Sequence, residues 1–417
     1  RARGRSRVPH PTPCRTRRRA TPCAAGVCAA VAQSADNRAF SHRIVIHLGI
    51  FRIFRMTVRT ETLLQALAQV RDPHTDQDYV STRAVRDLRV DGGAVSFTLE
   101  LGYPAQSLVP SLQQSLTAAA RSVPGVQQVA VEITSKVQAH AVQRGVPLLP
   151  EVKNIIAVAS AKGGVGKSTT AANLALARAA EGARVGVLDA DIYGPSQPMM
   201  LGLSGKPQSL DGKTMEPLQN HGLQVMSIGF LVEPEQAMIW RGPMATQALE
   251  QLLRQTHWQG LDYLVVDMPP GTGDIQLTLS QRTPVTGAVI VTTPQDIALL
   301  DARKGITMFE KVGVPILGIV ENMAVHVCSQ CGHAEHIFGA EGGKRMAAEC
   351  GLPYLGALPL DLRIREQADS GQPTVVADPD SEAAQTYRHI ARSVAARIAL
   401  QSKDYSAKFP PISVQGG

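Results

Sequence analysis

The stretch Ser160-Ala-Lys-Gly-Gly-Val-Gly-Lys-Ser-Thr169 decides how this chain folds. It follows a short apolar run, Ile155–Ala159, and opens a helical pattern, which is the context of a phosphate-binding loop. Glycines let backbone N–H groups approach phosphates without an intervening Cβ, and a helix N-terminus adds positive potential. We therefore expect the loop to bind a nucleoside triphosphate, namely ATP with Mg²⁺.

Each position of the loop has an expected role. Lys167 would reach the β and γ phosphates, the Ser168 hydroxyl would ligate Mg²⁺, and Thr169 would meet the α phosphate. The loop departs from the ordinary G-x-x-x-x-G-K-S/T pattern, because Ala161 takes the first position and an extra lysine, Lys162, follows it. The backbone groups that would surround the phosphates belong to Gly163, Gly164, Val165 and Gly166.

Two acidic motifs follow predicted strands farther along the chain. They are Asp189-Ala-Asp191 and Asp267-Met-Pro-Pro-Gly-Thr-Gly-Asp274. Ligand groups of an open α/β sheet lie at the carboxyl ends of its strands, so we place both motifs, Asp189 included, in the nucleotide pocket. Asp267 would hold a water of the Mg²⁺ ion, Asp191 would orient the attacking water, and Gly271 would sense the γ phosphate.

Apolar runs and helical stretches alternate from Ile155 onward. Nearly continuous hydrophobicity is typical of strands that a parallel sheet buries on both faces. The pattern predicts an α/β, doubly wound, mostly parallel sheet over residues 151–400, whose last helix is Glu382–Leu400. The predicted strands are Ile155–Ala159, Val185–Leu188, Val225–Ile228, Tyr263–Val266, Ala288–Val291 and Ile316–Val320.

Residues 56–137 are expected to form a small separate α/β domain. The order is α-β-β-α-β, with a hairpin signal at Asp91-Gly92-Gly93. Residues 138–150, which include two prolines, form a linker, and residues 401–417 a tail. The predicted elements are Thr60–Val70, Val80–Val90, Ala94–Leu101, Ala105–Arg121 and Gln127–Ile133.

The first 55 residues differ in composition from the rest. They hold twelve Arg and one acidic residue, a net charge of +11, so the total of +7 leaves −4 for the remainder. A slightly acidic body gives no indication of nucleic-acid binding. The favoured interpretation of residues 1–55 is translated upstream sequence with Met56 as the start; an Arg-rich transit peptide and a basic arm are the alternatives. No apolar run is long enough to span a membrane.

The cysteines of the body are Cys328, Cys331 and Cys350. Three cysteines make no disulfide framework in a chain of this size, and a reducing cytosol fits best. Cys350, on a predicted helix, is expected to be a buried apolar thiol. Cys328-x-x-Cys331 has the spacing to hold a metal or one edge of a cluster.

Two metals compete for the cysteine pair. A 4Fe–4S cluster usually takes four thiolates, which a symmetric homodimer would supply from two chains. His333 and His336 offer a Cys₂His₂ zinc set within one chain, although a single residue separates Cys331 from His333, closer than in zinc fingers. A redox or purely structural pair is the third alternative.

These residues resemble a known group. The Lys-Gly-Gly-Val-Gly-Lys-Ser loop is similar to that of the MinD/ParA class of ATPases, where the early lysine, here Lys162, crosses to the partner's nucleotide in an ATP-bridged homodimer. A closer resemblance is to the Mrp/ApbC family of iron–sulfur cluster carrier ATPases, and residues 56–137 are similar to the iron–sulfur assembly domain often fused ahead of them. The motifs that carry it are Asp189–Ser196, Arg241–Met244, Asp267–Asp274, Cys328–Gly332 and Ile337–Gly339.

The resemblance implies a function and two further contacts. Asn322 and Asp361, the latter in Pro359-Leu-Asp361, would contact adenine. The expected activity is Mg²⁺-dependent ATP hydrolysis that gates transfer of a cluster from the cytoplasmic homodimer to apo-proteins, with no nucleic-acid or membrane partner. The alternatives are a positioning ATPase of the MinD/ParA type, a zinc-stabilised ATPase switch, a reductase with an ATP-gated cluster and an interaction scaffold.

Overall fold

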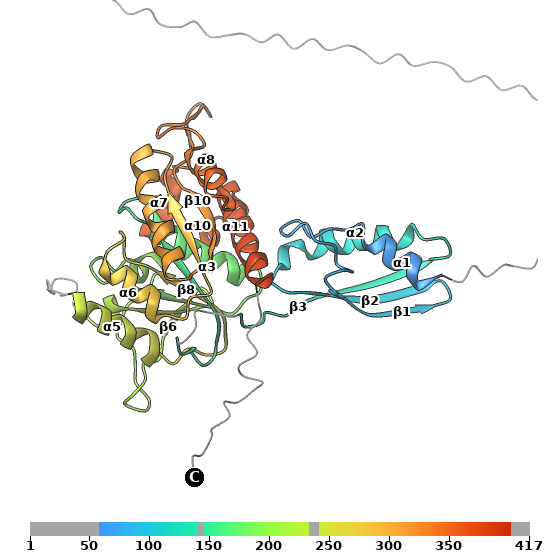
Figure 1. The fold of residues 1–417 in the computed structure, drawn as a ribbon, viewed down its shortest axis with the longest axis horizontal. Helices are drawn as coiled ribbons and strands as arrows, with labels where there is room; N and C mark the ends of the chain where they lie inside the picture. The colour runs from blue at the N-terminus through green and yellow to red at the C-terminus, as the bar shows by residue number, and fades with distance from the viewer. Residues whose placement is uncertain (1–57, 141–145, 233–241, 402–417) are drawn as a thin grey trace, which may run out of the picture. The chain divides into compact units, whose positions relative to one another are not determined.

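The computed structural model describes residues 58–140, 146–232 and 242–401 of the chain. The chain divides into two units, Arg1–Phe54 and Arg55–Gly417, and every described residue belongs to the second. The expectations for the leader, residues 1–55, and for the tail beyond Gln401 lie outside the described residues. Figure 1 carries the element labels used below.

The first described elements form a module, residues 60–135, in the predicted order α-β-β-α-β. Its sheet has the order β1-β2-β3, with β1 antiparallel to β2 and β2 parallel to β3. Figure 1 shows both helices on one side of this sheet. Leu63 of α1 and Leu116 of α2 are fully buried with Leu99 of β2. The elements are α1 (Thr60–Leu67), β1 (Val85–Asp91), β2 (Ala94–Leu101), α2 (Val109–Arg121, after the 3₁₀ turn Gln106–Leu108) and β3 (Gln128–Ser135).

The predicted strand Val80–Val90 begins five residues too early. The Asp78 carboxylate accepts the backbone N–H groups of Val80 and Ser81 at 3.0 and 2.7 Å, and Arg83 has a left-handed backbone with φ 56°. Such side-chain capping makes a turn more stable than an extended backbone. The strand therefore starts at Val85, whereas the predicted hairpin is found, with Asp91 opposite Ala94.

Eight of the later strands form one sheet in the order β13-β10-β9-β4-β8-β5-β7-β6, and β11 (His326–Val327) and β12 (Ala334–Glu335) form a separate pair. Within the eight-stranded sheet, every pair is parallel except β6 with β7. All six predicted strands are present, and short edge strands β6 and β13 were not predicted. The strands are β4 (Val152–Ala159), β5 (Val185–Asp189), β6 (Leu218–Asn220), β7 (Leu223–Ser227), β8 (Leu261–Asp267), β9 (Gly287–Thr292), β10 (Ile316–Glu321) and β13 (Tyr354–Ala357).

Helices cover both faces of this sheet, as a doubly wound fold requires. Helix α3 packs along α11, whereas α5, α6, α7 and α8 pack against one another in chain order. Right-handed crossovers are the rule for parallel strands of this kind. The helices are α3 (Lys167–Ala180), α4 (Gln197–Met200), α5 (Gly242–Gln255), α6 (Asp274–Arg282), α7 (Asp296–Lys311), α8 (Gly342–Glu349), α9 (Leu362–Asp369), α10 (Thr374–Ala377) and α11 (Glu382–Ala399).

The last helix, α11, is a core helix. The Ser381 side chain caps its start, and Tyr387, Ile390 and Val394 are almost fully buried. Burying each such side chain stabilises the fold by about 1.5–3 kcal/mol. Within the parts of the chain that the structure describes, none of the helices combines the length and apolar character that crossing a membrane requires.

Candidate functional site

The phosphate loop joins the end of β4 to the start of α3. Gly164 and Gly166 have left-handed backbones with φ 81° and 79°, a conformation that glycine adopts without strain. A Cβ added at Gly163 or Gly164 would meet nothing within 4 Å, so this side of the loop is open to a ligand. Because Lys167 is the first residue of α3, the unpaired N–H groups of the helix start face the loop.

Lys167 is buried against carboxylates at the ends of two neighbouring strands. Its ammonium contacts the Asp267 carboxylate and the Ser168 hydroxyl, the latter at 3.1 Å, and lies 3.7 Å from Asp191. Lys167 is 6% exposed and Asp267 is fully buried. A buried lysine is stable only with a counter-ion. The structure therefore brings together three residues that the sequence places far apart.

Asp189 lies beside Asp267 at the end of β5. It accepts hydrogen bonds from the backbone N–H of Gln197, at 3.1 Å, and from the Ser227 hydroxyl, at 3.0 Å. Complete burial, and next the nearby Asp267 charge, raise the pKa of Asp189 to about 7. Burial also raises the pKa of half-buried Asp191, although Lys167 opposes this.

Gln197, at the start of α4, is a member of the site that was not predicted. Its amide donates to the Asp267 carboxylate at 2.8 Å and to the Ser168 carbonyl at 3.0 Å. It is fully buried. Gln197 thus ties both strand-end motifs to the phosphate loop. Its position directly after Ser196 of the Asp189–Ser196 motif was the one available signal.

The other predicted nucleotide contacts surround this cluster. Thr169 is half-buried in the first turn of α3, and the Gly271 N–H donates to the Ser160 carbonyl at 3.0 Å. Lys162 is half-buried, and its side chain has no hydrogen bond or ion pair with the described residues. Its ammonium is therefore available to a group outside this part of the chain.

The two predicted adenine contacts lie in different surroundings. The Asn322 amide donates to the Val165 carbonyl of the phosphate loop at 2.9 Å, and Asn322 is 8% exposed. Asp361 caps α9 by accepting the Arg363 N–H at 2.8 Å, and it pairs with the Arg363 guanidinium at 2.8 Å. The structure brings Asn322, but not Asp361, into hydrogen-bond contact with the loop; contact with adenine stays a prediction.

Cys328 and Cys331 lie in a small ribbon, residues 326–335, after β10. Its strands are β11 (His326–Val327) and β12 (Ala334–Glu335). The Cys328 N–H donates to the His333 carbonyl and the Gly332 N–H donates to the Cys328 carbonyl, at 2.9 and 2.8 Å. Gly332 has φ 71°, which closes the turn. Both cysteines are free thiols; Cys328 is half-buried and Cys331 exposed.

The turn favours the thiolate form of Cys328. Backbone N–H groups of Gln330 and then Cys331 donate to the Cys328 sulfur, and they lower its pKa below the ordinary value of 9.0. The thiolate is the form that ligates metals, and N–H donors to sulfur stabilise a bound cluster. The geometry suits a metal or cluster at the surface.

The histidines after the cysteine pair do not join it. The His336 ring bonds the Ala324 carbonyl through Nδ1, at 2.6 Å, and His333 is exposed. Within the described residues, no group of three or more His, Cys, Asp or Glu side chains is close enough to hold a metal ion. A one-chain Cys₂His₂ zinc set is therefore not preformed. Cys350 is half-buried after α8, with Arg303 at 3.5 Å from its sulfur, rather than fully buried as predicted.

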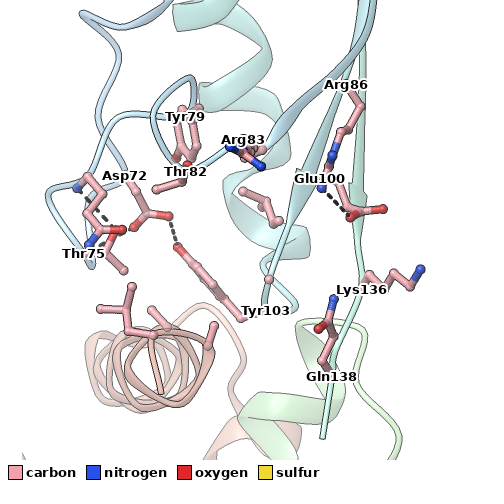
Figure 2. Close-up of a pocket in the computed structure, with 17 residues that line it drawn as sticks. Asp72, Thr75, Tyr79, Thr82, Arg83, Arg86, Glu100, Tyr103, Lys136 and Gln138 are labelled. Carbon is pink, nitrogen blue, oxygen red and sulfur yellow. Dashed lines mark hydrogen bonds and ion pairs between the residues drawn. The ribbon is translucent and has the colours of Figure 1, made fainter. Parts of the chain in front are cut away.

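A hollow of about 170 Å³ beside the N-terminal module is a separate feature (Figure 2). Figure 2 shows Asp72 next to Tyr103, whose hydroxyl donates to the carboxylate at 2.8 Å. Asp72 also accepts the backbone N–H groups of His74 and Thr75 at 2.8 and 3.0 Å. Because Asp72 is satisfied by its own chain, we assign it a structural role. Neither the phosphate loop nor the cysteines line this hollow.

Comparison with known proteins agrees with both halves of the chain. The family model described as NUBPL iron-transfer P-loop NTPase matches residues 151–395, and a model described as iron-sulfur cluster assembly protein matches residues 60–133. A solved nucleotide-binding protein from Archaeoglobus fulgidus, in complex with ADP, is 38% identical, with a TM-score of 0.49 over 56% of this chain and 90% of that chain.

Curated relatives extend the match. An iron-sulfur cluster carrier protein from Pseudomonas fragi is 59% identical over 66% of this chain and 97% of its own length. A protein of the same name from Escherichia coli strain K12 is 49% identical over 81% and 92%. The mouse iron-sulfur cluster transfer protein NUBPL is 55% identical over 61% and 82%. The chain therefore belongs to the family of NUBPL-type iron-transfer P-loop NTPases, with an iron–sulfur assembly domain ahead of the NTPase domain.

Proposed function

We propose that the chain is an ATP-dependent carrier that binds an iron–sulfur cluster and transfers it to apo-proteins. One observation carries the proposal: the same α/β fold holds both a phosphate loop, with its lysine between strand-end carboxylates, and a pair of free thiols in a surface ribbon, half-buried Cys328 and exposed Cys331. The names of the relatives support the same cargo. We propose the division into residues 56–137, a linker 138–150 and residues 151–400 as the working domain map.

The phosphate site supplies the residues for ATP hydrolysis. Lys167 pairs with carboxylates here, and the β and γ phosphates would offer it the same negative charge. Ser168, Thr169 and the backbone N–H groups of residues 163–167 would hold the phosphates, and Asp191 would orient the attacking water. Gly271 would lie near the γ phosphate.

The residues fit Mg²⁺. Asp191 and Asp267 share a single lysine, so two carboxylates meet one cation, and a divalent cation would balance the excess negative charge. Ser168 and Asp267 would hold the ion, the latter through a water. When bound, Mg²⁺ would neutralise phosphate charge during transfer to water.

The number of cysteines in each chain supports a homodimer. Each chain offers Cys328 and Cys331, and a 4Fe–4S cluster takes four thiolates. Two chains would therefore share one cluster across a symmetry axis. Lys162, which has no partner within the described residues, is suited to reach the nucleotide of the second chain. Free thiols agree with a reducing cytosol as the location.

The alternative functions have weaker support. A positioning ATPase would need a membrane-binding terminal helix or a DNA-binding surface, whereas α11, the last helix of the described residues, is packed into the core. A zinc-stabilised switch would need ligands that the ribbon does not bring together.

Reconstitution tests the proposal. The full chain is treated anaerobically with ferrous iron and sulfide, and its visible absorption, iron content and mass in solution are measured. We expect about four irons per dimer, lost in the Cys328→Ser/Cys331→Ser variant. The cluster should then activate an apo-ferredoxin faster with Mg-ATP. A colourless protein that retains one zinc per chain would overturn the carrier proposal.

A further inference from the structure

A single side chain connects the phosphate loop to the segment that carries the cysteines. Asn322 directly follows β10, and Cys328 lies six residues farther on. The Asn322 amide donates to the Val165 carbonyl at 2.9 Å, and its backbone N–H donates to the Thr292 carbonyl at 2.7 Å. The root of the cysteine ribbon is therefore bonded both to the central sheet and to the loop.

The contact between Asn322 and the loop is close. A Cβ added to Gly166 would lie 2.1 Å from the Asn322 amide nitrogen, which is shorter than any tolerated contact. Gly166 has φ 79°, so its position depends on glycine for two reasons. A displacement of the Val165–Gly166 peptide group must therefore displace Asn322 or break its hydrogen bond.

That peptide group would face the phosphates of a bound nucleotide as well. The Val165 carbonyl and the Gly166 N–H belong to one planar unit. When a phosphate oxygen accepts the N–H, the peptide polarises and its carbonyl becomes a stronger acceptor for Asn322. If the loop opens, the same peptide plane would rotate, and the hydrogen bond from Asn322 would weaken. Nucleotide and Asn322 thus act on the two ends of one group.

Few residues separate Asn322 from the cysteines, and backbone geometry and hydrogen bonds fix the first of them. Met323 has a left-handed backbone with φ 57°, which fixes the change of direction after β10. The Ala324 N–H then donates to the Leu358 carbonyl at 3.0 Å, and the His336 ring bonds the Ala324 carbonyl at 2.6 Å. Beyond this root, residues 329–337 are exposed. A shift of the root would therefore move the cysteines as a body.

We infer that Asn322 is a positioning residue that transmits the nucleotide state of the phosphate loop to the geometry of Cys328 and Cys331. The inference rests on the proposed function, because it explains how ATP would alter the hold on a cluster. A ligand shifts such an equilibrium only through a difference in affinity between two states, and the Val165–Asn322 bond is where that difference would arise.

The test uses the metal-free full chain, so that it does not depend on a cluster. The rate of alkylation of Cys328 and Cys331 by iodoacetamide is measured by mass spectrometry with and without Mg-ATP. We expect ATP to change the wild-type rate several-fold. Asn322→Ala should bring the ratio close to one at an ATP concentration that saturates each protein, as a binding titration of each variant establishes. Asn322→Asp keeps the shape but sets an oxygen against the Val165 carbonyl, so it should uncouple as well and serves if the alanine variant misfolds.

Asn173→Ala is the matched control. Asn173 is also buried and donates to a carbonyl of α3, that of Thr169, at 3.0 Å, but its other bond leads to Val375. Asn173→Ala should keep the wild-type ratio of alkylation rates with and without Mg-ATP. If both Asn322 variants keep it too, or if ATP leaves the wild-type rate unchanged, the inference is wrong. Loss of cluster binding in the wild type would instead overturn the proposed function, and the alkylation ratio would be unaffected by that result.

Discussion

The phosphate site and the cysteine ribbon lie along the same chain but are built in opposite ways. Lys167, Asp189 and Asp267 are buried; Lys167 pairs with Asp267, and Asp189 accepts hydrogen bonds from Gln197 and Ser227. Cys331 is exposed, and the ribbon that carries it has two strands of two residues. The first region is held by the whole sheet, whereas the second is held at its root.

The difference also appears in the acid–base behaviour of the two regions. Burial raises the pKa of Asp189, which disfavours its charge, while backbone N–H donors lower the pKa of Cys328, which favours its charge. A preorganised buried site suits catalysis on a small ligand, since its geometry costs no reorganisation. A pair of thiols in a surface ribbon suits a cargo that must leave, since a recipient can reach it.

Lys167→Ala should give the largest effect. The variant removes the cation that would neutralise the transferred phosphate, so ATP hydrolysis should fall by about 100-fold or more. Iron uptake at Cys328 and Cys331 should persist, because the ribbon takes no bond from Lys167. Phosphate release measures ATP hydrolysis, and iron content measures iron uptake. Turnover within a factor of three of wild type would show that the phosphate site is assigned wrongly.

Gln197→Ala should lower the stability of the fold more than a substitution in the cysteine ribbon does. It removes the buried amide that donates to one Asp267 oxygen and to the Ser168 carbonyl, while Lys167 still pairs with the other Asp267 oxygen; this should lower the free energy of unfolding by about 1–3 kcal/mol. Cys331→Ser, in the exposed ribbon, is the matched control and should change it by less than about 0.5 kcal/mol. Urea denaturation of the metal-free proteins measures both. Equal losses would contradict the contrast drawn between the two regions.

The sequence was sufficient for the elements that obey a strict pattern. Parallel strands end at one edge of a sheet, so the strand pattern alone was enough to place Asp189 and Asp267 beside Lys167. Gln197 could not be placed in this way, because its contacts depend on where the four-residue helix α4 settles and no spacing rule encodes that. The bond from Asn322 to Val165 was missed for the same reason: it joins residues 157 positions apart.

The shortest strands are the part of the fold that the sequence did not predict. The edge strands β6 and β13 have three and four residues, too few to establish a period, and both contain half-buried positions. Strand β1 begins late because Asp78 caps a turn, a local interaction that competes with a β-pattern of side chains. The order of elements was predictable, and their ends were set by individual side chains.

Asp189→Asn tests the effect of burial on acidity. The folded-state pKa of Asp189 is raised, so as pH falls from about 7 toward 4 the folded protein takes up a proton that the unfolded chain does not, and wild type gains stability. Asparagine does not titrate. The stability of the variant relative to wild type should therefore be higher at pH 8 than at pH 5, by on the order of 1 kcal/mol. If the stabilities of wild type and variant change in parallel with pH across this range, in buffer without nucleotide or metal, the assigned effect of burial on Asp189 is wrong.

The smallest effect is expected at Cys328, whose pKa is lowered, whereas the pKa of Asp189 is raised. Because N–H groups of Gln330 and Cys331 stabilise the thiolate, alkylation of Cys328 in the metal-free protein should reach half its maximal rate at a lower pH than in the urea-unfolded chain. Cys331→Ser should retain most of this shift, since the two strongest donors belong to the backbone. A midpoint that moves up to the unfolded value in this variant would assign the effect to the second thiol. The two cysteines would then act as a coupled pair, and the turn would not prepare Cys328 for a metal by itself.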